Sequence, residues 1–156
     1  AYELTGDRRF LDSALKVARY MARVQRPNGA IYRSLSLDGS TRRGDYIGSA
    51  VAFSGIVWLR LRDYGVGAEF DAPIERAADW LLAHQAPLSH PDPNLRGAFL
   101  NLWARDREGA TGLYQRDIGT AFALRFLAAY LRDLDGADVN DDPLTWRAHH
   151  RAAAKG

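Results

Sequence analysis

The chain contains 156 residues, and its 21 basic and 19 acidic side chains leave a formal net charge of +2. This balance argues against a nucleic-acid partner, and the absence of cysteine excludes disulfides, thiolate metal sites and cysteine nucleophiles. No apolar run reaches the roughly 18 residues that a membrane span needs, so we expect a globular domain, or part of one, with a sizeable core.

The first predicted helix runs from residue 7 to about residue 25. Asp7 can cap its start, and Pro27-Asn28-Gly29 stops it. Its apolar residues recur at helical spacing on one side, which predicts an amphipathic, half-exposed helix. These residues are Leu11, Ala14, Ala18 and Met21.

The second predicted helix covers residues 46–62 and differs in character. Apolar side chains surround it on every side, and a helix of that kind is buried all round. Residues 71–85 predict a third helix, which Asp71 can cap and which is amphipathic like the first.

A segment of about thirty residues, Ala86 to Asp117, is rich in proline and glycine and is predicted to be a loop. Residues 118–134 predict a fourth helix, apolar on nearly every face. We therefore assign residues 1–134 to a helical segment and residues 135–156 to a polar C-terminal tail, which Leu144 and Trp146 can dock.

Similar segments recur in the two halves of the chain, and this self-similarity indicates stacked helical units. Amphipathic helices alternate with fully apolar ones, which suits an outer and an inner ring. The sequence therefore predicts an all-α fold, an α/α toroid of helical hairpins. The corresponding segments are residues 18–21 and 78–81, Gln25 and Gln85, Gly29 and Gly97, and residues 47–50 and 118–121.

The first residues of the chain, Leu4-Thr5-Gly6-Asp7 followed by Phe10 and Leu11, resemble the hairpin connection of carbohydrate-active (α/α)6 barrels. These include unsaturated glucuronyl hydrolases, N-acylglucosamine 2-epimerases and polysaccharide lyases. Because Ala1 to Asp7 is typical of the end of one helix and the turn to the next, we expect a C-terminal portion of a larger barrel. The rest of the toroid, or another domain or chain, would then cover its N-terminal edge.

A second resemblance is to the QW repeats of squalene–hopene-type cyclases. The segment from Lys16 through Gln25 to Gly29 is similar to that repeat, and Arg76 to Gln85 repeats its first half. Ile31 and Phe99 stand where the repeat ends in tryptophan, and the cyclases' Asp-x-Asp-Asp motif has no match. We interpret the likeness as shared toroid architecture, in which the glutamine bonds backbone groups at a helix end.

Asp45 and Asp117 stand immediately before the two predicted inner helices. Two carboxylates that face one cavity can act as general acid and base on a sugar, and glucuronyl hydrolases resemble this chain in placing acidic residues at inner-helix starts. The alternative is that both aspartates simply cap their helices, since aspartate is a preferred N-cap residue.

The loops that lead into the inner helices also hold candidate substrate-binding residues. Arginines can hold a carboxylate or sulfate through paired hydrogen bonds, aromatic rings can stack on sugars, and a histidine can act as a base. The alternatives are solvated surface arginines, ordinary aromatic packing and a plain surface histidine. The candidates are Arg42, Arg43, Arg96 and Arg116, the aromatic residues Tyr32, Tyr46, Trp103 and Tyr114, and His90.

The leading function is therefore the hydrolysis, elimination or epimerisation of a uronate-like or amino sugar. A cyclase-like toroid that acts on isoprenoids is one alternative, and a non-catalytic toroid segment that binds another protein domain is a second. The sequence offers no metal-ligand spacing around His149-His150 or elsewhere, so we expect neither a metal nor a cofactor.

Overall fold

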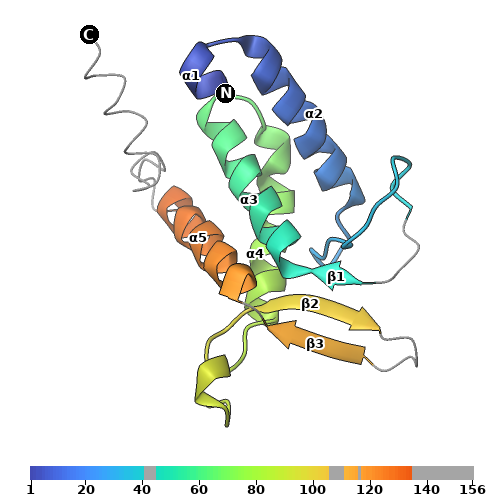
Figure 1. The fold of residues 1–156 in the computed structure, drawn as a ribbon. Helices are drawn as coiled ribbons and strands as arrows, with labels where there is room; N and C mark the ends of the chain where they lie inside the picture. The colour runs from blue at the N-terminus through green and yellow to red at the C-terminus, as the bar shows by residue number, and fades with distance from the viewer. Residues whose placement is uncertain (41–44, 106–110, 116, 135–156) are drawn as a thin grey trace.

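The computed structural model describes residues 1–40, 45–105, 111–115 and 117–134, with the backbone alone at 103–105, 111–115 and 117. This part is mostly helical, and a small antiparallel sheet lies below the lower ends of the helices in Figure 1. The main helices are α2 (Arg8–Val24), α3 (Gly48–Asp63), α4 (Asp71–Ala83) and α5 (Asp117–Leu134), with short turns α1 (Tyr2–Thr5), η1 (Ala68–Phe70) and η2 (Pro93–Leu95).

Helix α3 lies at the centre of the bundle, in contact with α2, α4 and α5 (Figure 1). Its Trp58 is fully buried, and the indole Nε1 donates a hydrogen bond of 3.1 Å to the Ala18 carbonyl oxygen of α2. This bond satisfies the polar end of the ring, so the whole side chain can fill the core. Other large core side chains are Leu59, Phe70, Ile74, Leu81 and Phe126.

The start of α2 follows the predicted capping. The Asp7 carboxylate accepts a hydrogen bond of 2.9 Å from the Arg9 backbone N–H. That bond satisfies one of the amides that a helix start leaves unpaired. The helix buries Leu11 and Ala18, while Val17 is exposed, so α2 is amphipathic as its spacing predicts.

The segment predicted to be one long loop contains two strands, which corrects that prediction. Strand β2 (Leu100–Arg105) pairs with β3 (Thr111–Gln115), and β1 (Tyr46–Ile47) joins the other edge of β2. The two residues of β1, Tyr46 and Ile47, lie where the sequence predicts the start of the second helix. The strands are short and interrupted by polar residues, so their alternation is too brief to stand out against the surrounding glycines and charges.

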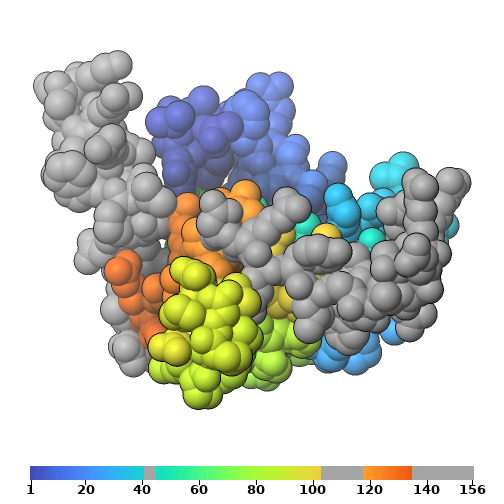
Figure 2. Space-filling model, turned by 60° about the horizontal axis from the view of Figure 1, so that its bottom comes forward, coloured from blue at the N-terminus to red at the C-terminus, as the bar shows by residue number. Residues whose placement is uncertain are grey.

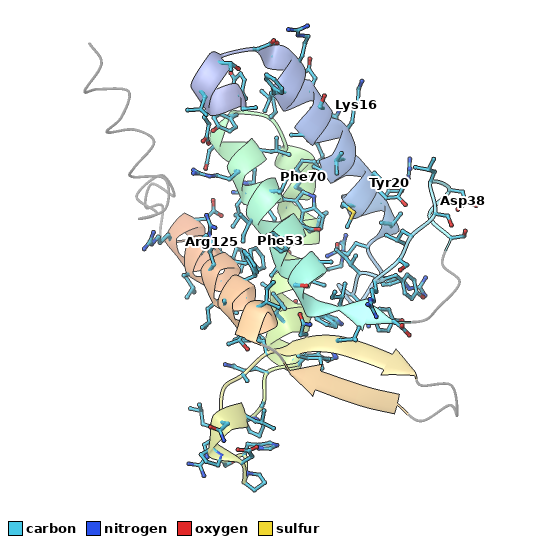
Figure 3. All side chains as sticks on the ribbon, viewed as in Figure 1. Lys16, Tyr20, Asp38, Phe53, Phe70 and Arg125 are labelled. Atoms are coloured by element: carbon cyan, nitrogen blue, oxygen red, sulfur yellow. The ribbon has the colours of Figure 1, made fainter. Side chains whose placement is uncertain are left out.

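Both apolar helices leave one face open to solvent among the described residues, although we expected burial on every side. In α3 the Phe53 side chain is 45% exposed, and in α5 the Leu124 side chain is 55% exposed. Phe53 contacts Phe122 of α5, with ring centroids 3.9 Å apart (Figure 3). An apolar surface therefore remains uncovered.

Within the described part of the chain, no helix combines the length and the apolar character that crossing a membrane requires.

Candidate functional site

The turns that follow α2 and α4 share one set of side-chain contacts. Nε2 of Gln25 donates to the Gly29 carbonyl oxygen at 3.3 Å, and Nε2 of Gln85 donates to the Gly97 carbonyl oxygen at 3.0 Å. Gln25 also donates to the Pro73 carbonyl oxygen of α4 at 3.1 Å. Each glutamine thus closes the turn after its own helix. Its acceptors lie in the turn or, for Pro73, inside α4, so neither glutamine satisfies an unpaired group at the end of its own helix as we expected.

The backbone of the two turns matches as well. The Arg26 N–H donates to the Ala30 carbonyl oxygen at 2.9 Å, and the Ala86 N–H donates to the Ala98 carbonyl oxygen at 2.8 Å. Gly29 and Gly97 both adopt left-handed backbone, with φ of +88° and +73°, a conformation that glycine adopts without steric cost. Ile31 and Phe99, which follow these turns, are fully buried.

Two further glycines allow β2 to cross the starts of α3 and α5. A Cβ on Gly48 would lie 2.0 Å from the Leu100 carbonyl oxygen, and one on Gly119 would lie 2.7 Å from Cβ of Asn101. Only glycine fits at such distances. Both helix starts therefore meet at the beginning of β2, so the loops before α3 and α5 lie at the same end of the molecule (Figure 1).

Asp45 lies at this end, directly before β1. Its side chain is 5% exposed, and its carboxylate forms no hydrogen bond or ion pair with any described residue. The N-cap residue of α3 is Ile47, without a side-chain capping bond, so the capping alternative for Asp45 is wrong. The Asp45 residue is held in place through its backbone, because its carbonyl oxygen accepts a hydrogen bond of 2.8 Å from the Arg33 N–H.

Aromatic rings and a cation gather at the start of β1, next to Asp45 in the chain. The rings of Tyr32 and Tyr46 stack, with centroids 4.9 Å apart and planes 20° apart, and the Arg26 guanidinium lies 5.7 Å from the Tyr32 centroid. Burial, followed by a hydrogen bond with Tyr32, raises the pKa of Tyr46 above its ordinary value. We call Arg26, Tyr32, Asp45 and Tyr46 the β1 cluster.

Strand pairing places further aromatic residues on the strands next to β1. Trp103 of β2 lies directly opposite Tyr46, and Tyr114 of β3 lies opposite Leu102. Tyr46 and Trp103 thus share one face of the sheet, whereas Tyr114, paired with Leu102, belongs to the other face.

The strand register sets the backbones of Asp45 and Asp117 apart. Asp45 precedes Tyr46, which pairs with Trp103, whereas Asp117 follows Gln115, which pairs with Leu100 at the other end of β2. Strand spacing and rise place the two backbones more than roughly 14 Å apart. The carboxyl groups of a two-carboxylate sugar site lie within about 10 Å of each other. The Asp117 side chain lies outside the described residues, so the cleft shared by Asp45 and Asp117 stays a prediction.

The remaining candidates lie elsewhere or outside the described residues. His90 and Arg96 belong to the projecting turn around η2, where Nε of Arg96 donates to the His90 carbonyl oxygen at 2.8 Å (yellow-green in Figure 2). Arg42, Arg43 and Arg116 lie outside the described part of the chain, as does the tail with His149-His150. Among the described residues, no group of histidine and acidic side chains could hold a metal ion.

Sequence reasoning missed Arg26 and Asn101. Arg26 follows Gln25 in the chain, and its guanidinium approaches the Tyr32 ring because the turn after α2 folds the chain back. Asn101 is 6% exposed, and its Oδ1 has no hydrogen-bond partner among the residues that the structure describes. It lies against Gly119 at the start of α5. No spacing marks either residue, because both contacts arise from the close crossing of loops and helix starts.

An apolar groove of about 310 Å³ lies between the first half of α2 and the second half of α3, towards the opposite end of α3 from β1. Apolar side chains from α1, α2 and α3 line most of it, and Glu3 and Arg60 stand at its rim. The lining includes Tyr2, Phe10, Ala14, Ile56 and Val57.

Comparison with known proteins gives no identification: no protein-family model matches the chain, and neither a curated protein nor a solved structure matches it.

Proposed function

We propose that this chain is part of an α/α toroid that binds and processes a saccharide at the β1 cluster. The supporting fold evidence is the shared set of contacts in the turns after α2 and α4. The same glutamine-to-glycine bond, the same backbone bond and the same left-handed glycine occur in both. Such recurrence is expected of stacked hairpin units.

The observation that carries the proposal is the stacked pair of Tyr32 and Tyr46 with the Arg26 guanidinium near it, at the start of β1 where Asp45 lies. Sugar-binding sites need flat apolar surfaces for the ring faces and polar groups for the hydroxyls. Tyr32 and Tyr46 supply the first, and Asp45 can accept hydroxyl hydrogen bonds or move a proton. Arg26 supplies a cation that can pair with a carboxylated or sulfated sugar.

Calorimetric titration with uronate and amino-sugar oligosaccharides tests this proposal. We expect Tyr46→Ala to weaken binding of the saccharide about tenfold, which corresponds to losing about 1.4 kcal/mol. Tyr20→Ala is the matched control. The Tyr20 hydroxyl donates a hydrogen bond to the Ser36 carbonyl oxygen, and Tyr20 does not belong to the β1 cluster. Equal binding by both variants would contradict the proposal, and so would failure of every saccharide to bind.

Asp45→Asn separates catalysis from binding. If Asp45 moves a proton, the variant should bind saccharide within about threefold of the unchanged chain, because the amide oxygen still accepts hydrogen bonds. Turnover should fall by about a hundredfold or more, the usual contribution of a general acid or base. Unchanged turnover would leave Asp45 with a binding role only.

A cyclase-like toroid is the second candidate, and the Phe53–Phe122 pair favours it. These rings lie on the faces of α3 and α5 that meet, and Phe53 is partly exposed. An apolar, aromatic inner surface is what an isoprenoid needs. Titration with an isoprenoid diphosphate distinguishes the two, since Phe53→Ala would weaken isoprenoid binding and leave saccharide binding unchanged.

A further inference from the structure

One stripe of helix α4 holds the turn that follows α2. Nε2 of Gln25 donates to the Pro73 carbonyl oxygen at 3.1 Å, and Nε of Arg76 donates to Oε1 of Gln25 at 3.2 Å. A Cβ on Gly29 would lie 1.9 Å from the Arg76 carbonyl oxygen and 2.9 Å from Cβ of Trp80. Pro73, Arg76 and Trp80 follow one another at helical spacing, so they lie on one side of α4. We call these three residues the α4 stripe.

The turn that follows α4 has the same groups without such a neighbour among the described residues. Gln85 is exposed, and its side chain bonds only the Gly97 carbonyl oxygen of its own turn in this part of the chain. A Cβ on Gly97 would approach only side-chain atoms of Leu88 and Gln85 among the described residues. This turn therefore offers the donor and the space with which the first turn receives the α4 stripe.

The sequence after α5 repeats the start of α4 at a shift of 70 residues. The matching segments 47–50 and 118–121, at the starts of α3 and α5, are shifted by nearly the same amount, 71 residues. Residues 141–155 therefore follow α5 in the chain as α4 follows α3. The residues of α4 that recur are Asp71, Pro73, Ile74 and Ala78, as Asp141, Pro143, Leu144 and Ala148.

We propose that residues 141–155 form a helix that binds the turn after α4, where the Pro143 carbonyl oxygen accepts a hydrogen bond from Nε2 of Gln85. Acidic residues and a proline at the start, four alanines further on and a lysine at the end favour a helix there. Trp146 takes the position of Arg76, whose contact with Gly29 is made by the backbone carbonyl. That contact is kept, whereas the bond from the guanidinium has no counterpart.

The connection after α5 has nearly the length of the one that leads into α4. Nine residues separate the end of α3 at Asp63 from Pro73, and eight separate the end of α5 at Leu134 from Pro143. Helices α3 and α5 lie side by side (Figure 1), and a salt bridge of 3.1 Å joins their last turns. A helix can therefore be placed against α5 as α4 is placed against α3.

The bound segment should detach more readily than α4. Phe70, just before α4, stacks on Trp58 of α3 with ring centroids 6.1 Å apart, and both rings are fully buried. The matching positions hold Asn140 and Ala129, so less apolar surface is available to hold the segment. A terminal segment of this kind opens locally while the rest of the chain stays folded. Its binding is therefore measured at the turn itself, where global unfolding would report little.

The chain has no cysteine, so one engineered cysteine can carry a spin label. We would label His149→Cys in the full chain, because its counterpart Asp79 is exposed on α4, and measure paramagnetic broadening of the backbone amide signals. The amides of Leu88 and Gly97 should broaden more strongly than the amide of Val17, which is exposed on α2. Equal broadening at the two places, or none at either, would overturn the proposal.

Matched glycine variants make the result specific. Gly97→Ala puts a methyl group where the carbonyl oxygen of the bound helix would lie, so broadening of the Leu88 amide should fall to the level of α2. Gly65→Ala is the control, because its φ of +69° resembles the +73° of Gly97 and no described atom lies within 4 Å of its Cβ position. It should leave the broadening unchanged, and equal broadening in both variants would contradict the proposal.

Gln85→Ala tests the proposed hydrogen bond. It should lower the ratio of bound to detached segment about fivefold, the equivalent of one hydrogen bond, and an unchanged ratio would contradict the assignment of Gln85 as the donor. A mixture of labelled chain without isotopes and isotope-enriched chain without label tests for a second copy. We expect no broadening in that mixture, and broadening of the Gly97 amide there would overturn the intramolecular proposal.

Discussion

The turns after α2 and α4 have the same internal bonds, but their surroundings differ. The first turn packs against the next helical unit: Gln25 is 8% exposed and also bonds the Pro73 carbonyl oxygen, and Nε of Arg76 donates to Oε1 of Gln25 at 3.2 Å. Gln85 is exposed and bonds only its own turn among the described residues. The turn geometry is thus local, and only the first turn is also held by the neighbouring helix α4 among the described residues.

The glycines should show the largest difference between the turns. A Cβ on Gly29 would lie 1.9 Å from the Arg76 carbonyl oxygen, whereas one on Gly97 would meet only side chains, the nearest at 3.3 Å. Gly29→Ala should therefore lower the free energy of unfolding by about 3 kcal/mol or more, and Gly97→Ala by about 1 kcal/mol from backbone strain alone. Urea unfolding of both variants measures this. Similar losses would show that the first turn is not held by α4.

The glutamines should differ in the same direction by a smaller amount. Gln25→Ala removes the donor to the Gly29 and Pro73 carbonyl oxygens and the acceptor of Arg76 Nε, which should cost about 2 kcal/mol. Gln85→Ala exposes one carbonyl oxygen to water and should cost about 0.5 kcal/mol. Thermal unfolding compares the two, and an equal or larger loss for Gln85→Ala would contradict the comparison.

Alkaline pH should give the smallest effect. The pKa of Tyr46, beyond the first turn, is raised above its ordinary value of 10.0, so the folded state holds its proton after the unfolded state has released it. The free energy of unfolding should therefore fall as the pH rises above about 10. Tyr46→Phe should reduce this fall. Denaturation followed between pH 8 and 11 measures it, and an unchanged slope in the variant would exclude Tyr46 as its source.

Much of the helical arrangement follows from the sequence, because its periodicity is long and strong. The pattern of Leu11 and Ala18 predicts α2, and Asp7 marks its start. Gln25 and Gly29 recur in the sequence as Gln85 and Gly97, and in the structure each glutamine donates a hydrogen bond to the carbonyl oxygen of its glycine.

The sheet and the detail of the candidate site were not predictable in the same way. Strand β1 is two residues long and joins β2 from across the chain, so no local pattern indicates it. The same pairing stacks Tyr32 on Tyr46 and separates Asp45 from Asp117. Position before a helix suggested that the two aspartates were equivalent, whereas strand register, a long-range property, decides where they lie.

The most direct test of the proposed ligand face is a nuclear magnetic resonance titration of the isotope-enriched full chain with the saccharide that binds in calorimetry. The proposal predicts shifts of the backbone signals of Tyr32, Asp45 and Tyr46, with the signals of the η2 turn, such as Asn94, unchanged. Shifts confined to the groove around Phe10 and Val57, or to the η2 turn, would contradict a saccharide site at the β1 cluster.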